Sequence, residues 1–158
     1  MENFLNPLFI FGAKYLFILS FIIAGVYFLK QSWESKKKIV LLGLISVIII
    51  YAIAFIAGQL YNDPRPFVIE HFTPLIPHDP DNGFPSDHVL MVSAITAVVY
   101  FFNRKISFIL LGISILVAIS RVYVGVHHPI DVIASVVFSF VGASITYTFL
   151  KYVQSKKI

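Results

Sequence analysis

Long runs of apolar residues, separated by short polar segments, dominate the pattern along the chain. Each run is close to the ~20 residues that a helix needs to cross the hydrocarbon core of a bilayer, and the third is the shortest. The five runs cover residues 7–29, 39–61, 86–102, 106–124 and 131–150. The pattern therefore predicts an all-α integral membrane protein, built as a bundle of about five transmembrane helices.

Composition supports this class. Apolar residues make up 58% of the chain and charged residues only 13%, where soluble domains average about 25% charged residues. A length of 158 residues predicts a single membrane-embedded domain, residues 1–158. The chain has no cysteine, which excludes disulfides and thiolate metal sites. No basic leader precedes the first run, so we expect a retained helix rather than a cleaved signal peptide.

The basic residues predict the orientation in the membrane. Nine of the 12 lysines and arginines fall in alternate connections, which share one side of a five-span topology: Lys30, Lys36, Lys37, Lys38, Arg104, Lys105, Lys151, Lys156 and Lys157. The positive-inside rule places that side in the cytoplasm and the amino terminus outside. The net charge of +4 does not indicate nucleic-acid binding, because the charges are segregated by membrane side rather than gathered in one patch. We expect a multi-pass protein of the plasma membrane.

The chemically versatile residues gather on the opposite, outer side. Seven of the eight acidic residues lie there, together with Lys14, Arg65, Arg121, His71, His78, His88, His127 and His128. This asymmetry predicts an active or binding site at the extracytoplasmic ends of the helices.

Three outer segments carry groups suited to phosphate chemistry. Arg65 and Arg121 offer planar, permanently charged donors for phosphate oxygens. Ser86 precedes a helical run as a plausible N-cap, and a helix start with free backbone N–H groups binds anions. His127 and Asp131 are four residues apart. If a helix begins near Pro129, the carboxylate holds one imidazole nitrogen and leaves the other free.

The order and spacing of these residues resemble the three-part signature of the type-2 phosphatidic acid phosphatase superfamily, with the core motifs within residues 58–131. The segments 64–68, 75–78 and 84–88 look most like the bacitracin-resistance type of undecaprenyl-diphosphatase. The motifs are Arg65-Pro66, Pro85-Ser86-x-His88 and Ser120-Arg121-x5-His127-x3-Asp131.

The resemblance implies an enzyme that hydrolyses undecaprenyl diphosphate to undecaprenyl phosphate and phosphate, and so recycles the lipid carrier for cell-wall polymers. It implies that His127 forms a phosphohistidine, that Asp131 orients it, and that His88 protonates the departing lipid phosphate. The expected ligands of the phosphate are Arg65, Ser86 and Arg121, with Lys14 as a further candidate. No metal and no other cofactor is expected; the partners are the polyprenyl diphosphate lipid and the bilayer.

Two positions depart from the family pattern. Gly58 stands where the first motif commonly begins with a lysine. Lys14 could replace that cation, because intramembrane charges are functional candidates, or it could extend to the outer headgroups as an anchor. Asp87 fills the usual glycine position, which we interpret as a mark of the subfamily.

Other interpretations stay open at this point. The enzyme could instead be a phosphatidate or phosphatidylglycerophosphate phosphatase, or transfer phosphate to another lipid. Non-catalytic alternatives are a transporter, although such proteins place ionisable groups near the midplane, and a lipid-binding protein. A single arginine at a span end is usually an anchor. His128 is not four residues from Asp131, and His71 and His78 are expected in a solvated loop.

Overall fold

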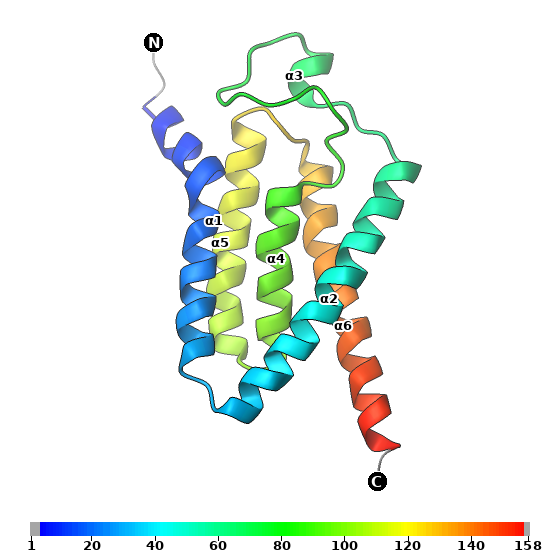
Figure 1. Ribbon diagram of the computed structural model, residues 1–158. Coiled ribbons are helices and arrows are strands. Elements are labelled where there is room, and N and C mark those ends of the chain that lie inside the picture. Colours follow the sequence, from blue (N-terminus) through cyan, green and yellow to red (C-terminus); the bar gives the residue numbers. More distant parts are fainter. Residues whose placement is uncertain (1–3, 157–158) are drawn as a thin grey trace.

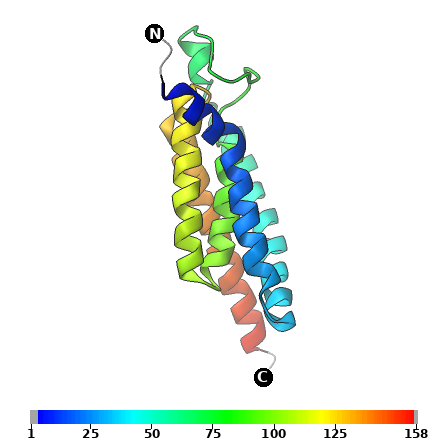
Figure 2. The ribbon, with the colours of Figure 1, turned by 90° about the vertical axis from the view of Figure 1, so that its left-hand side faces the viewer.

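The computed structural model describes residues 4–156. Within them the regular secondary structure is all helical, with no β-strand. Five helices form an elongated bundle, and a single turn, α3, lies in the connection at one end (Figures 1 and 2). The helices are α1 Asn6–Leu29, α2 Trp33–Leu60, α3 Pro66–Ile69, α4 Asp87–Tyr100, α5 Arg104–Tyr123 and α6 Pro129–Ser155. The predicted all-α membrane bundle is confirmed.

The third apolar run differs from the expectation of five full spans. α1, α2, α5 and α6 are long and apolar enough to cross a membrane, but α4 has 14 residues and is about 21 Å long at ~1.5 Å per residue. Helix α4 packs against all four long helices, and nine of its residues are buried. It is a central core helix. An apolar run does not distinguish burial in lipid from burial in protein, which is why its sequence resembles a span.

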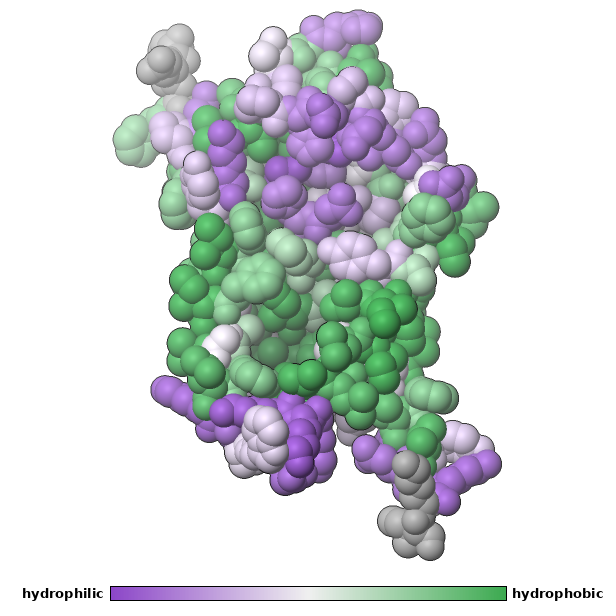
Figure 3. Space-filling model, viewed as in Figure 1, coloured by the Kyte–Doolittle hydropathy of each residue, from purple (hydrophilic) through white to green (hydrophobic). Residues whose placement is uncertain are grey.

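The face of the bundle shown in Figure 3 is apolar in the middle and polar at both ends. Large apolar side chains such as Leu44, Ile48 and Phe55 on α2 are exposed, as expected for helices that face lipid. Lys36, Lys37 and the other basic residues of the first turns of α2 lie at the end opposite the α3 connection. Lys157, one of the nine predicted inner cations, lies outside the described residues.

Small and hydroxyl residues let the helices approach closely around α4. A Cβ at Gly142 of α6 would lie 2.5 Å from Cγ1 of Ile50 on α2. Ser139 Oγ donates a hydrogen bond to Leu90 O of α4 at 3.1 Å, and Ser107 Oγ of α5 donates to Thr96 O of α4 at 2.9 Å. Close packing and interhelical hydrogen bonds of this kind hold helices together where the lipid offers no hydrophobic driving force.

The connection between α2 and α4 is folded down onto the ends of the helices. Leu75 N donates to Val124 O at 3.0 Å, and Ile76 is buried in a cluster with Ala13 and Val126. The ring of Phe72 lies over Gly125, where a Cβ would come within 2.6 Å of it. The connection is therefore a fixed roof over the ends of α4, α5 and α6 (Figure 1).

Asn82 closes the base of this roof. Its Oδ1 accepts from Asp63 N at 2.9 Å and from Phe84 N at 3.0 Å. Its Nδ2 donates to Gly58 O at 3.0 Å. These bonds bring the two motif segments on either side of the connection next to each other.

Candidate active site

His127 lies in the short connection between α5 and α6, under the roof. Gly125, at φ +82°, turns the chain after α5, in a region of φ that favours glycine. His127 is only 2% exposed. Helix α6 begins at Pro129, as the sequence predicts, so Asp131 stands one turn beyond His127.

The carboxylate of Asp131 holds one nitrogen of this imidazole. Asp131 is fully buried, and its Oδ2 lies 3.2 Å from His127 Nδ1 and accepts from His128 N at 2.9 Å. Because a carboxylate only accepts, Nδ1 carries the proton and Nε2 presents its lone pair. Burial, followed by the charges of Arg121 and Arg65, lowers the pKa of His127 to about 2. The imidazole is therefore neutral at neutral pH.

Two arginines meet at that lone pair. Arg65 Nη1 is 3.3 Å and Arg121 Nη2 3.4 Å from His127 Nε2. Arg65 also donates to Val126 O at 2.8 Å and to Asp81 Oδ1 at 2.7 Å. Arg121 Nε finds no hydrogen-bond partner within the described part of the chain. Two buried like charges with unused donors form a site for an anion, because an anion offsets their repulsion and accepts their hydrogen bonds.

Ser86 and His88 extend the site at the start of α4. Ser86 is the N-cap residue; it is fully buried, and its Oγ has no hydrogen-bond partner in residues 4–156. His88 is half-buried, with its ring edge-on to Phe17 of α1 at a centroid distance of 5.7 Å. Burial, followed by the charges of Arg121 and His127, lowers the pKa of His88 to about 4. The structure thus brings together five residues of the two later motifs and Arg65 of the first. The five are Ser86, His88, Arg121, His127 and Asp131.

Asp63 and His128 lie behind Asp131. His128 Nδ1 is 3.2 Å from Asp63 Oδ2, and burial, then the charge of Asp131, raises the pKa of Asp63. One ligand atom from each of Asp63, His128 and Asp131 lies within 4.8 Å of the others, a spacing that would suit a cation. His128 N donates to Asp131 Oδ2, and this bond supports the carboxylate that holds His127. His128 thus contacts this carboxylate through its backbone N–H.

The position of Lys14 and the space around Gly58 bear on the missing family lysine. Lys14 is exposed on α1, one turn toward the roof from Phe17, and makes no hydrogen bond or ion pair to any described residue. It is not part of the hydrogen-bonded cluster. A Cβ at Gly58 would lie 3.1 Å from Phe84 O, so the roof occupies the space into which a side chain there would extend.

His78 is a site residue that sequence reasoning missed. We expected it in the solvated loop, but its ring centroid is 6.1 Å from that of His127, and its side chain is 23% exposed. The available signal was weak: His78 lies between two motif segments, directly before a turn. Its partner in that expectation, His71, is indeed exposed.

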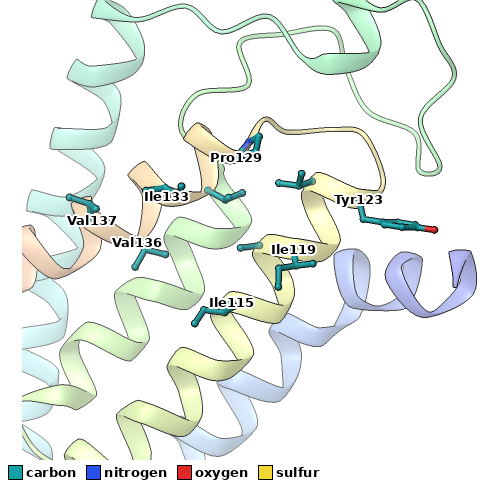
Figure 4. A pocket seen from close by; sticks show the side chains of 10 residues that line it. Ile115, Ile119, Tyr123, Pro129, Ile133, Val136 and Val137 are labelled. Carbon is teal, nitrogen blue, oxygen red and sulfur yellow. The ribbon is translucent and has the colours of Figure 1, made fainter.

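Two apolar grooves in the bundle begin near the site. One lies between α5 and α6 and has a volume of about 600 Å³. Pro129 lines it next to the α5–α6 connection, and Ile133 and Val137 line it farther along α6 (Figure 4). The other lies between α1, α2 and α4, with a volume of about 450 Å³. Its lining includes Phe21, which packs on the Phe17 that contacts His88. Apolar chains fit such surfaces.

Comparisons with known proteins show the family to which the chain is similar. Residues 36–155 match the model of the PAP2 superfamily. The chain is 32% identical over 148 residues to the undecaprenyl-diphosphatase BcrC of Bacillus subtilis, covering 94% of this chain and 76% of that protein. It is 35% identical over 133 residues to an undecaprenyl-diphosphatase of Sulfolobus acidocaldarius, covering 82% and 63%.

Solved structures share the fold. LpxE of Aquifex aeolicus superposes with a TM-score of 0.72 at 21% identity, covering 94% of this chain and 88% of that one. A PAP2-type phosphatidylglycerolphosphate phosphatase of Bacillus subtilis gives a TM-score of 0.61 at 24% identity, covering 97% and 80%.

Proposed function

The chain belongs to the PAP2 superfamily and is a multi-pass membrane lipid phosphatase, and we propose that it hydrolyses undecaprenyl diphosphate to undecaprenyl phosphate and phosphate. The observation that carries the chemistry is the lone pair of His127 Nε2, held between two buried arginines. The relatives named undecaprenyl-diphosphatase, at 32% and 35% identity, support this substrate.

His127 is the nucleophile. Its Nε2 attacks the terminal phosphorus, forming an N–P bond while the bond from that phosphorus to the bridging oxygen breaks. The imidazole gains positive charge as it does so, and the buried Asp131 at 3.2 Å stabilises that charge and keeps Nε2 pointed at the substrate. The product of this step is a phosphohistidine and undecaprenyl phosphate.

Arg65, Arg121 and Ser86 bind the oxygens of the transferred group. The unused Nε of Arg121 and the unpaired Oγ of Ser86 are donors already buried in the site. Preorganised donors of this kind stabilise the charge of a phosphoryl-transfer transition state without reorganisation. These three residues therefore hold the equatorial oxygens.

His88 serves the leaving group. The bound diphosphate offsets the positive charges that lower the pKa of His88, so the ring takes up a proton from solvent. It gives this proton to the bridging oxygen as undecaprenyl phosphate departs, then takes a proton from the water that cleaves the phosphohistidine and releases phosphate. The lipid must leave on the side of His88, where Phe17 and then Phe21 lead into the α1–α2–α4 groove. We assign this groove to the isoprenoid chain nearest the diphosphate, while the rest of the tail stays in the bilayer.

The site faces outward in this proposal. Lys36, Lys37 and Lys38 lie at the end of the bundle opposite the roof and the site. Since lysine-rich connections stay in the cytoplasm, the site opens at the extracytoplasmic surface, where the headgroup of a lipid diphosphate lies.

Phosphate release by the protein in proteoliposomes, with a chelator present, tests the proposal. Undecaprenyl diphosphate, farnesyl diphosphate, phosphatidate and phosphatidylglycerophosphate are compared as substrates. We expect undecaprenyl diphosphate to have the highest kcat/KM, and faster turnover of either glycerolipid would refute the substrate assignment. His127→Ala should lower kcat by roughly 10³-fold or more, whereas the control His71→Asn, on the exposed roof, should retain it. Full release by His127→Ala would refute the nucleophile.

A further inference from the structure

We propose that His78 is a phosphoryl-binding residue of this site, supplied by the roof: its imidazole hydrogen-bonds an equatorial oxygen of the terminal phosphoryl group as that group moves to and from His127. This inference rests on the proposed function. It assigns a substrate contact to a residue outside the three motifs.

The distance between the two imidazoles fits this contact. A phosphorus poised for attack lies about 3–3.5 Å from the attacking atom. The ring centroids of His78 and His127 are 6.1 Å apart, with their planes at 75°. A phosphoryl group attacked by His127 Nε2 would therefore lie beside the His78 ring, close enough for an oxygen to reach the ~2.7–3.2 Å range of a hydrogen bond.

The hydrogen bonds of His78 leave one nitrogen for this purpose. Nδ1 lies 3.3 Å from Asp79 O, and because a carbonyl only accepts, Nδ1 carries a proton. Nε2 has no hydrogen-bond partner among residues 4–156. It is the atom free to contact a ligand.

The charges around His78 change its protonation when a phosphoryl group binds. Burial, followed by Arg65, lowers the pKa of His78; Arg121 lowers it further, while the Asp79 carbonyl and the Asp81 carboxylate raise it. Without ligand the ring is therefore neutral. A phosphoryl dianion offsets both arginines, so that Nε2 takes up a proton from solvent and donates it as a hydrogen bond.

The roof fixes His78 in place. Asp81 Oδ1 accepts from Arg65 Nε at 2.7 Å and lies 4.0 Å from His78 Nδ1. Ile76, two residues before His78, is 3% exposed. One carboxylate thus links the roof histidine to the arginine that binds the same phosphoryl group. With Gly58 in place of the family's lysine, His78 brings a further positive donor from a different segment.

Steady-state kinetics of His78→Gln and His78→Ala, across the acid limb of the pH profile, test the proposal. The matched control is His71→Asn, a second histidine of the same roof that is exposed and has a φ of 54°, which asparagine tolerates. We expect His78→Ala to lower kcat/KM roughly 10- to 100-fold, as for loss of a hydrogen bond to a charged group. Inhibition by orthophosphate should weaken to a similar extent. His78→Gln should retain part of the activity and lose one ionisation from the profile.

A second readout separates this inference from the proposed function. Histidine NMR of ¹⁵N-labelled protein, with the His78 signal identified by its absence in His78→Gln, should show proton uptake at His78 when orthophosphate is added. If undecaprenyl diphosphate proves not to be the substrate, this titration still tests the contact. Unchanged orthophosphate inhibition in both variants, or a His78 signal that does not respond to orthophosphate, would overturn the assignment.

Discussion

Replacing Asp131 by asparagine tests the charge that stands behind the reactive imidazole of His127. Oδ2 of Asp131 receives two donors, His127 Nδ1 at 3.2 Å and His128 N at 2.9 Å. An asparagine whose oxygen takes the place of Oδ2 keeps both bonds, and its NH2 group takes the place of Oδ1. The substitution therefore removes the negative charge that stabilises the imidazolium as the N–P bond forms, and leaves the position of the ring unchanged.

The magnitude follows from the loss of that negative charge. A carboxylate-to-amide change behind a catalytic histidine lowers kcat by up to about 10⁴-fold in the serine-protease triad, and we expect 10²- to 10⁴-fold here. KM should change less than threefold or so, since Arg65 and Arg121 hold the phosphate independently of Asp131. The effect should therefore appear in kcat.

The assay is phosphate release from undecaprenyl diphosphate in detergent micelles, with kcat and KM determined separately. Glu34→Gln is the matched control, because this acid pairs with Lys37 on an exposed surface at the opposite end of the bundle. It should leave both constants unchanged. A kcat for Asp131→Asn within about threefold of the unsubstituted protein would refute the view that the charge of this carboxylate supports His127 as the nucleophile.

Three further outcomes are expected. Gly25→Leu adds a side chain in open space in the α1–α2–α4 groove and should lower kcat/KM for undecaprenyl diphosphate more than for farnesyl diphosphate. Gly112→Leu, on α5, also adds a side chain in open space and should not change kcat/KM in this way. Equal effects of the two substitutions on kcat/KM would refute the groove assignment. Because the chain lacks cysteine, a membrane-impermeant maleimide on intact cells should label Asp79→Cys and not Glu34→Cys, and the reverse would place the site inside. Burial and two arginines depress the pKa of His127 from 6.5 to about 2, so the unfolded chain binds more protons than the folded protein between these pH values. Acidification below pH 6.5 should therefore cost up to about 1.4 kcal/mol of stability per pH unit. His127→Gln should lose less thermal stability on acidification than the unsubstituted protein, and equal acid sensitivity of the two would contradict this.

Much of the site was predictable because its geometry is local. Pro129 favours the first turn of a helix, and a helix starting there places Asp131 against His127 with no information from the rest of the fold. Ser86 likewise marks the start of α4. The apolar runs likewise predicted the long helices, because length and hydropathy alone decide whether a helix can cross a bilayer.

The remainder depends on contacts between distant segments. The central position of α4 follows from packing by four other helices, which its apolar sequence does not encode separately from contact with lipid. His78 reaches the site because Ile76 and Phe72 anchor the roof on Ala13 and Gly125, and no periodic pattern in the loop indicates that docking. The position of Lys14 along the chain likewise did not decide whether it replaces the missing lysine or anchors α1 at the outer headgroups.

The most direct test of the central claim is to trap the enzyme during turnover of undecaprenyl diphosphate labelled with ³²P on the terminal phosphorus. After an alkaline quench within one turnover, we predict an acid-labile, alkali-stable label on the peptide that contains His127, and none in His127→Ala. Rapid turnover with no labelled protein at any time point, or the label on a different residue, would contradict the account.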